Sequence, residues 1–121
     1  MRLWHQAMIE KLPRQQLLGQ HRECCALRGK GWLKPHSVIN YIFDYDIQHL
    51  EQYHKLVMLE MQRRGYNVSH EWEMSNYRGK ALETIIGEKI VKPIGKVYKE
   101  HDALYYQECV DNLKSKGIVI E

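Results

Sequence analysis

The sequence predicts an all-α protein in which about three packed helices form a single small domain over residues 1–121, with an ordered N-terminal arm and irregular loops. Three observations support this fold class. Apolar residues recur at helical spacing in two long segments, and glycine or proline stands at the ends of these segments. The length of 121 residues is enough for one hydrophobic core and too short for two ordinary domains. Helices of this length bury their apolar faces by packing on one another.

The N-terminal part of the chain is expected to form an arm followed by a helix. Residues 1–11 have no helical stripe and predict an irregular or extended arm, which ends at Leu12-Pro13. The segment 14–27 is amphipathic, and the glycines at 29–31 end it. Its apolar face carries Leu17, Leu18, His21, Cys24, Cys25 and either Leu27 or Arg28.

The segment 32–44 is expected to be a loop whose apolar run, 38–43, is either buried coil or a short strand. Asp46 then caps a second helix, which ends at Gly65. Six residues at helical spacing form the buried stripe of this helix: Leu50, Tyr53, His54, Val57, Met58 and Met61.

The C-terminal part is expected to begin with a loop over 67–80 and a short helix over 82–91. A third helix is predicted from about 98 to 116, before Gly117. The residues predicted to face the core from this helix are Ala103, Tyr106, Val110 and Leu113.

Composition excludes several classes of protein. Hydrophobic residues make up 44% and charged residues 27%, which is typical of a globular chain. No apolar run is long enough to span a bilayer, and polar residues interrupt the start where a signal peptide would lie. We therefore expect a cytoplasmic protein that does not bind membranes and is a monomer. Three cysteines, two of them adjacent, do not form a disulfide framework.

Charge is unevenly distributed, although the formal net charge is only +3. Basic residues dominate the first 36 positions, whereas acidic residues dominate 44–60. The interpretation is a basic surface that faces nucleic-acid phosphates. Trp4 and Trp32 flank this segment and are candidates for stacking on a base. The basic candidates are Arg2, Arg14, Arg22, Arg28, Lys30 and Lys34.

One helix segment also offers possible metal ligands. His21, Cys24 and Cys25 follow i, i+3, i+4 spacing, and His5 or His36 would complete a site. Paired metal-binding motifs are absent from the sequence, so buried thiols are the favoured interpretation and no metal or cofactor is expected. A thiol nucleophile at this helix edge is a further alternative, although the sequence identifies no oxyanion hole.

Four segments, in this order, resemble the pyrimidine-dimer DNA glycosylase family, of which phage-type endonuclease V is an example. The first is Arg22-Glu23 on an early helix after a basic lead-in, and the second is the run Gln62-Arg63-Arg64-Gly65-Tyr66-Asn67-Val68 at the end of a helix. The others are Tyr77-Arg78-Gly79 and His101-Asp102-Ala103. The resemblance implies a small, mainly α-helical protein that acts on damaged or abasic double-stranded DNA.

The resemblance also implies a mechanism in which the chain's own α-amino group attacks the deoxyribose C1′ and forms an imine. Such an amine has a pKa near ~8, against ~10.4 for lysine, so a usable fraction is neutral at cellular pH. Glu23 matches the family's catalytic glutamate, and Arg22 matches the arginine that holds a phosphate. The amine must then reach Glu23, so the arm is expected to pack against the first and third helices and bring the Met1 nitrogen to this carboxylate.

The sequence departs from the family pattern at informative positions. Arg2 stands where a small residue allows removal of the initiator methionine, which assigns the amine to Met1. Ala26 stands where a further arginine is expected, and Arg28 is the nearest substitute. Two alternatives therefore accompany the glycosylase and abasic-site lyase hypothesis: a non-catalytic nucleic-acid-binding helical protein of the same fold, and a metal-dependent hydrolase.

Overall fold

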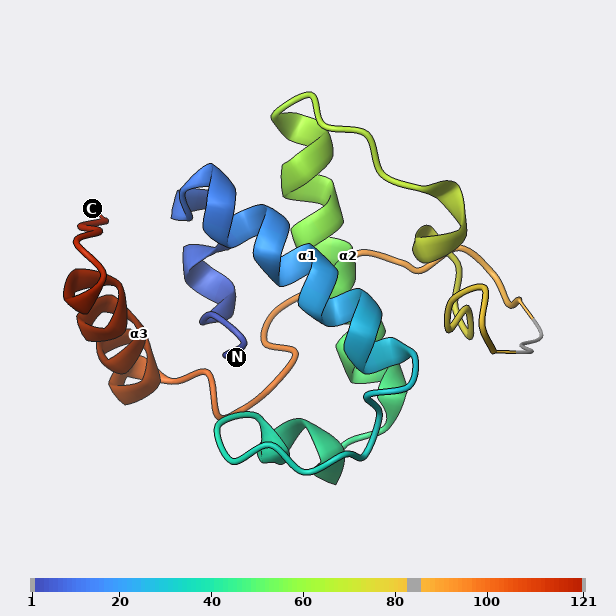
Figure 1. Cartoon of the computed structure of the whole chain (residues 1–121), viewed down its shortest axis with the longest axis horizontal. Coiled ribbons are helices and arrows are strands. Elements are labelled where there is room, and N and C mark those ends of the chain that lie inside the picture. The colour runs from blue at the N-terminus through green and yellow to red at the C-terminus, as the bar shows by residue number, and fades with distance from the viewer. Residues whose placement is uncertain (1, 83–85, 121) are drawn as a thin grey trace.

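Helices dominate the computed structural model, which describes residues 2–82 and 86–120 (Figure 1). The all-α prediction is confirmed. The described ranges hold one isolated antiparallel bridge, Met74 with Lys89, and none of their helices is long and apolar enough to cross a membrane. The α-helices are α1 (Arg14–Arg28), α2 (Ile47–Arg63) and α3 (Ala103–Ser115), and the 3-10 helices are η1 (Gln6–Lys11), η2 (Asn40–Asp44) and η3 (His70–Glu73).

Helices α1 and α2 cross and form the centre of the core (Figure 1). The predicted stripe of α2 is confirmed, because all six of its residues are buried. The buried face of α1 consists of Leu17, Gln20, Cys24, Leu27 and Arg28. The turn after α1 requires glycine at position 31, because a Cβ there would lie 2.9 Å from the carbonyl oxygen of Ala26. The glycine stop at the end of α2 is confirmed by Gly65, whose φ is +88°.

The N-terminal arm is ordered and lies between α1 and α3 (Figure 1). Its second half is the 3-10 helix η1, so the expectation of an irregular or extended arm holds only for residues 2–5. The His5 side chain accepts a hydrogen bond from Ala7 N and caps η1. Five apolar residues bury this segment in the core, namely Leu3, Trp4, Met8, Ile9 and Leu12.

The C-terminal half differs from the prediction in its boundaries. Helix α3 begins at Ala103 rather than near 98, because the Asp102 side chain accepts a hydrogen bond from Tyr105 N and caps the helix there. Its buried residues are Cys109 and Leu113, whereas Ala103 is exposed.

Two further segments, 38–43 and 82–91, also differ from the prediction where the structure describes them. The apolar run 38–43 leads into the 3-10 helix η2 rather than a strand. The helix expected over 82–91 includes 83–85, which lie outside the described residues, and 86–91 are not helical. Instead, Lys89 pairs with Met74 through the isolated bridge.

Candidate active site

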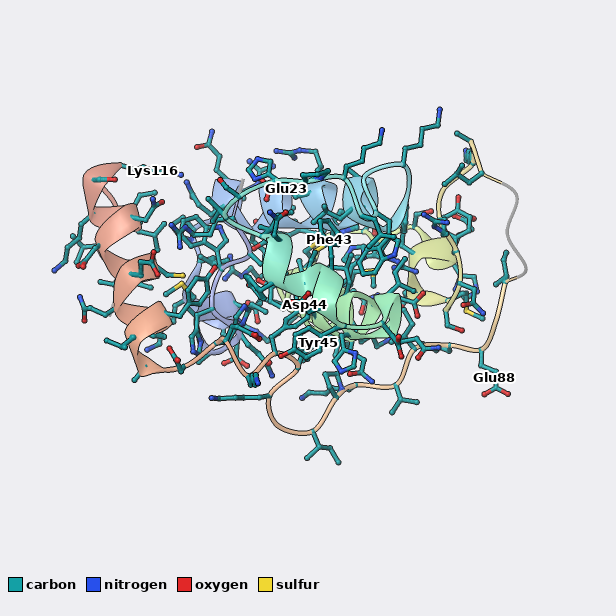
Figure 2. All side chains as sticks on the ribbon, turned by 90° about the horizontal axis from the view of Figure 1, so that it is seen from below. Glu23, Phe43, Asp44, Tyr45, Glu88 and Lys116 are labelled. Atoms are coloured by element: carbon teal, nitrogen blue, oxygen red, sulfur yellow. The ribbon has the colours of Figure 1, made fainter. Side chains whose placement is uncertain are left out.

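Glu23 is half-buried at one edge of the core-facing side of α1. Figure 2 shows it on the same side of the molecule as Lys116, the residue that follows α3, and far from Glu88. Burial raises the pKa of the Glu23 carboxyl, and the positive charges of Lys116 and Arg22 oppose this increase. A half-buried carboxyl with a raised pKa is suited to proton transfer near neutral pH.

The start of the chain reaches Glu23 through Gln20, one helical turn earlier on α1. The Gln20 Nε2 donates to the carbonyl oxygen of Arg2 at 3.1 Å and to Glu23 Oε2 at 3.2 Å. Met1 lies outside the described residues, so the predicted distance from its nitrogen to Glu23 stays a prediction. The described part of the arm nevertheless ends beside this carboxylate.

Gln20 is a site residue that the sequence analysis did not select. It is 1% exposed, and it lies in the buried stripe between Leu17 and Cys24. A glutamine at the centre of an apolar stripe is the available signal, because a buried amide needs hydrogen-bond partners. These partners come from the arm and from α2, which the helical spacing of α1 does not reveal.

Arg22 lies beside Glu23 in sequence and faces solvent. Arg14 is also exposed on α1, eight residues earlier, which corresponds to roughly 80° around the helix axis. Lys30 and Lys34 are exposed in the turn that follows α1. These four residues are therefore accessible for phosphate contacts, and a shared DNA-binding surface stays a prediction.

Arg2 is less accessible than the other basic candidates. Its side chain is 16% exposed, lies 4.0 Å from the Glu108 carboxylate and packs 5.7 Å from the centre of the Tyr105 ring. Arg2 therefore ties the arm to α3, in addition to any contact with DNA.

Arg28 is buried, which corrects its assignment to the DNA-binding surface. Its side chain is 0% exposed and donates to the backbone oxygens of Trp72, Met74 and Tyr77 at 2.7 Å, 2.9 Å and 3.1 Å. Its guanidinium carbon also lies 5.0 Å from the centre of the Trp72 ring. Burial lowers the pKa of Arg28, and the Glu51 carboxylate opposes this effect. Arg28 thus holds the segment 72–77 against α1.

The tryptophan candidates occupy different environments. Trp4 is 6% exposed and belongs to the core, with the Lys116 Nζ 5.4 Å from its ring centre. Its assignment as a base-stacking residue is corrected, because a flipped base cannot reach a ring packed in this way. Trp32 is half-buried and contacts the Phe43 ring edge-on at 5.1 Å, and its stacking role stays a prediction.

A histidine and cysteine cluster forms, but its members differ from those of the alternative metal site considered in the sequence. His21 and Cys25 on α1 meet His54 on α2, and their ligand atoms lie within 4.8 Å of one another. Cys24 points into the core instead and is fully buried. Burial raises the pKa of the Cys25 thiol to about 11, so a role as nucleophile is not supported.

The chemistry of the donors decides how well this cluster fits a metal. Arg28 Nη1 lies 3.0 Å from His54 Nδ1, and a guanidinium can only donate, so this nitrogen accepts. Burial lowers the pKa of His54 well below its usual value, so the ring is neutral and its proton sits on Nε2, 2.8 Å from His21 Nδ1. Metal ligation by His54 Nε2 would place a proton on Nδ1, against the Arg28 N–H. The cluster fits a directed hydrogen-bond chain better than a metal centre.

A cavity in the structure lies away from Glu23. It has a volume of about 600 Å³ and is formed by η1, α2 and the segment 92–96. Neither Glu23 nor Arg22 lines it. The cavity is therefore not part of the candidate active site.

Comparison with known protein families identifies a match over the N-terminal part of the chain. A family model described as "Pyrimidine dimer DNA glycosylase" matches residues 1–74. No curated protein and no solved structure matches the chain. The matched residues include the arm, α1, α2 and the first part of the segment 72–77 that Arg28 holds, and they include both Glu23 and Gln20.

Proposed function

Because the chain belongs to the pyrimidine dimer DNA glycosylase family, we propose that it removes a damaged base from double-stranded DNA and cleaves the resulting abasic site. The family assigns it to the DNA-repair glycosylases, whose substrate is DNA. The proposal adds the mechanism: an amine at Met1 is the nucleophile, Glu23 handles protons, and Arg22 binds a phosphate.

One observation carries this proposal. The Glu23 carboxylate and the backbone of Arg2 share the same amide donor, Gln20 Nε2. The chain start and a half-buried carboxyl are therefore neighbours, as a mechanism based on an N-terminal amine requires. Burial of this carboxyl strengthens its interaction with a cationic sugar, because the local dielectric is lower than that of water.

The proposed steps follow from this arrangement. The neutral amine donates its electron pair to C1′, the glycosidic bond breaks, and the base leaves with the bonding electrons and takes up a proton. Glu23 accepts the proton that the amine loses. The C1′–O4′ bond then breaks as the nitrogen lone pair forms the C1′=N bond, O4′ takes up the proton from Glu23, and the regenerated carboxylate stabilises the positive charge of the imine. Loss of a C2′ proton then allows β-elimination of the 3′ phosphate, which cleaves the strand.

The test is borohydride trapping on DNA that contains an abasic site or a pyrimidine dimer, because reduction fixes only an imine. Wild-type protein should give a covalent adduct, and Glu23→Gln should bind DNA but cleave it about 10²–10⁴-fold more slowly. Glu88→Gln is the matched control, because Glu88 is exposed and lies at one end of the molecule, away from Glu23 (Figure 2).

Binding of damaged DNA without an adduct would instead support the non-catalytic nucleic-acid-binding alternative. That alternative uses the exposed Arg14, Arg22, Lys30 and Lys34 and needs neither the amine nor Glu23. Equal cleavage by the Glu23→Gln and wild-type proteins would remove Glu23 from the mechanism.

A further inference from the structure

We propose that Gln20 is a positioning residue that fixes the start of the chain against Glu23 and keeps this carboxylate available as a proton acceptor. The inference rests on the proposed function for its catalytic meaning. Its structural basis is a set of contacts that the buried Gln20 amide makes with the arm, α1 and α2.

Both polar atoms of the Gln20 amide have hydrogen-bond partners. Its Oε1 accepts from Trp4 N at 2.7 Å and lies 3.0 Å from the Tyr53 hydroxyl on α2. Its Nε2 donates to Arg2 O and to Glu23 Oε2. Both N–H donors of this amide have an acceptor, and Oε1 accepts from Trp4 N, whereas the single Tyr53 hydrogen is shared between Oε1 and the nearer Trp4 carbonyl at 2.6 Å.

The orientation of the amide is determined by its partners. Trp4 N–H can only donate, so it must face Oε1, and the carbonyl of Arg2 can only accept, so it must face Nε2. A reversed amide would lose both contacts and turn its oxygen toward the Glu23 carboxylate. The arm and the carboxylate therefore select the same orientation.

Gln20 also fixes the path of the arm. It receives a hydrogen bond from residue 4 and gives one to residue 2, the spacing at which an extended strand presents its N–H and C=O groups to one side. The side chain thus replaces a neighbouring strand for Arg2, Leu3 and Trp4. Leu3 is 0% exposed, so this path also places an apolar side chain in the core.

The contact with Glu23 has an electrostatic consequence. An N–H that donates to a carboxylate favours the ionised form, which opposes the increase in pKa that burial causes. A side chain without this donor should leave Glu23 protonated to a higher pH, and a protonated carboxyl cannot accept a proton from the amine.

The experiment compares Gln20→Met with wild-type protein by two measurements. Carbon-detected NMR titration follows the Glu23 carboxyl in the free protein, where we expect the pKa to rise by about one pH unit. Borohydride trapping on abasic-site DNA should slow by about 10–100-fold, because a displaced nucleophile loses alignment. The acidic limb of the pH–rate profile should move to higher pH with the Glu23 titration.

Two controls separate positioning from general destabilisation. Tyr53→Phe removes the hydroxyl beside Oε1 and leaves both Nε2 contacts, so it should lower stability without changing the Glu23 titration. Gln15→Met changes an exposed glutamine on the same helix and should change neither measurement. If Gln20→Met does not fold, Gln20→Glu keeps the acceptor for Trp4 and Tyr53 and should raise the Glu23 pKa further.

The outcomes distinguish this inference from the proposed function. An unchanged Glu23 titration in the folded Gln20 variant would overturn the inference, even if wild-type protein forms the adduct. An increased Glu23 pKa without a wild-type adduct would support the coupling between Gln20 and Glu23 and overturn the proposed function. An increased pKa together with slower trapping supports both.

Discussion

Replacement of Arg28 by methionine tests directly how much this buried arginine contributes to the stability of the fold. Methionine fills much of the same volume but has no donors. Two buried acceptors, the Tyr77 carbonyl and His54 Nδ1, would lose their Arg28 partner. The carbonyls of Trp72 and Met74 also lose a donor, but these contacts are only partly buried and water can replace them.

The expected magnitude follows from these contacts. A buried acceptor without a donor costs about 1–3 kcal/mol, so the two buried groups predict a loss of about 2–6 kcal/mol in the free energy of unfolding. Loss of one partner of a buried ionic group costs about 3–5 kcal/mol, which falls in the same range. This is a large share of the ~5–15 kcal/mol that stabilises an ordinary domain.

Urea unfolding at neutral pH measures this loss, and Arg22→Met is the control. Arg22 is exposed on the same helix, so its replacement should change stability by no more than about 0.5 kcal/mol. Amide hydrogen exchange should also increase in 72–77, which Arg28 holds to α1. If Arg28→Met is as stable as Arg22→Met, the segment is held by other contacts and the reasoning is refuted.

Three further results are expected. Arg14→Ala and Arg22→Ala should each reduce the slope of log K against log[salt] for DNA binding by about 0.9, because each removes one phosphate contact; equal slopes for variants and wild type would contradict this. Burial lowers the pKa of His101 to about 3, so the unfolded chain takes up a proton below pH 6.5 that the folded protein does not. Stability from His101 should therefore fall as the pH drops from 6.5 toward 3, and the difference in unfolding free energy between wild type and His101→Phe should shrink over this range. Residues added before Met1 should abolish borohydride trapping, whereas the same residues added after Glu121 should not.

Local sequence patterns predicted a helix correctly where the spacing of its buried residues agrees with the residues that begin and end it. The buried stripe of α2 and its end at Gly65 are confirmed. Both could be predicted because the apolar spacing and the glycine that adopts a positive φ lie within the segment itself. The start of α3 was placed too early, although the cap residue Asp102 is visible in the sequence. Tyr98 is fully buried before that cap, so its apolar character reflects core packing rather than a helix.

The site was predictable only in part, because its key contacts join distant segments. The family resemblance selected Glu23 and Arg22, and the structure places the first beside the arm and the second in solvent. Arg28 has the same chemistry as Arg22 in the sequence. Its burial depends on carbonyls more than 40 positions away, which no local pattern contains. Gln20 was missed for the same reason.

The position of the arm has a consequence for biosynthesis. Tyr105 donates a hydrogen bond to the Leu3 carbonyl, and Gln6 N donates to His101 Nδ1, so the arm completes its contacts with residues nearly the whole chain away. Synthesis proceeds from the N-terminus, so the arm is made before α3. The arm therefore waits, unpartnered on that side, until most of the chain has been synthesised, and such distant contacts slow folding. The segment proposed to carry the nucleophile is thus among the last to reach its native place, which ties the appearance of activity to completion of the fold.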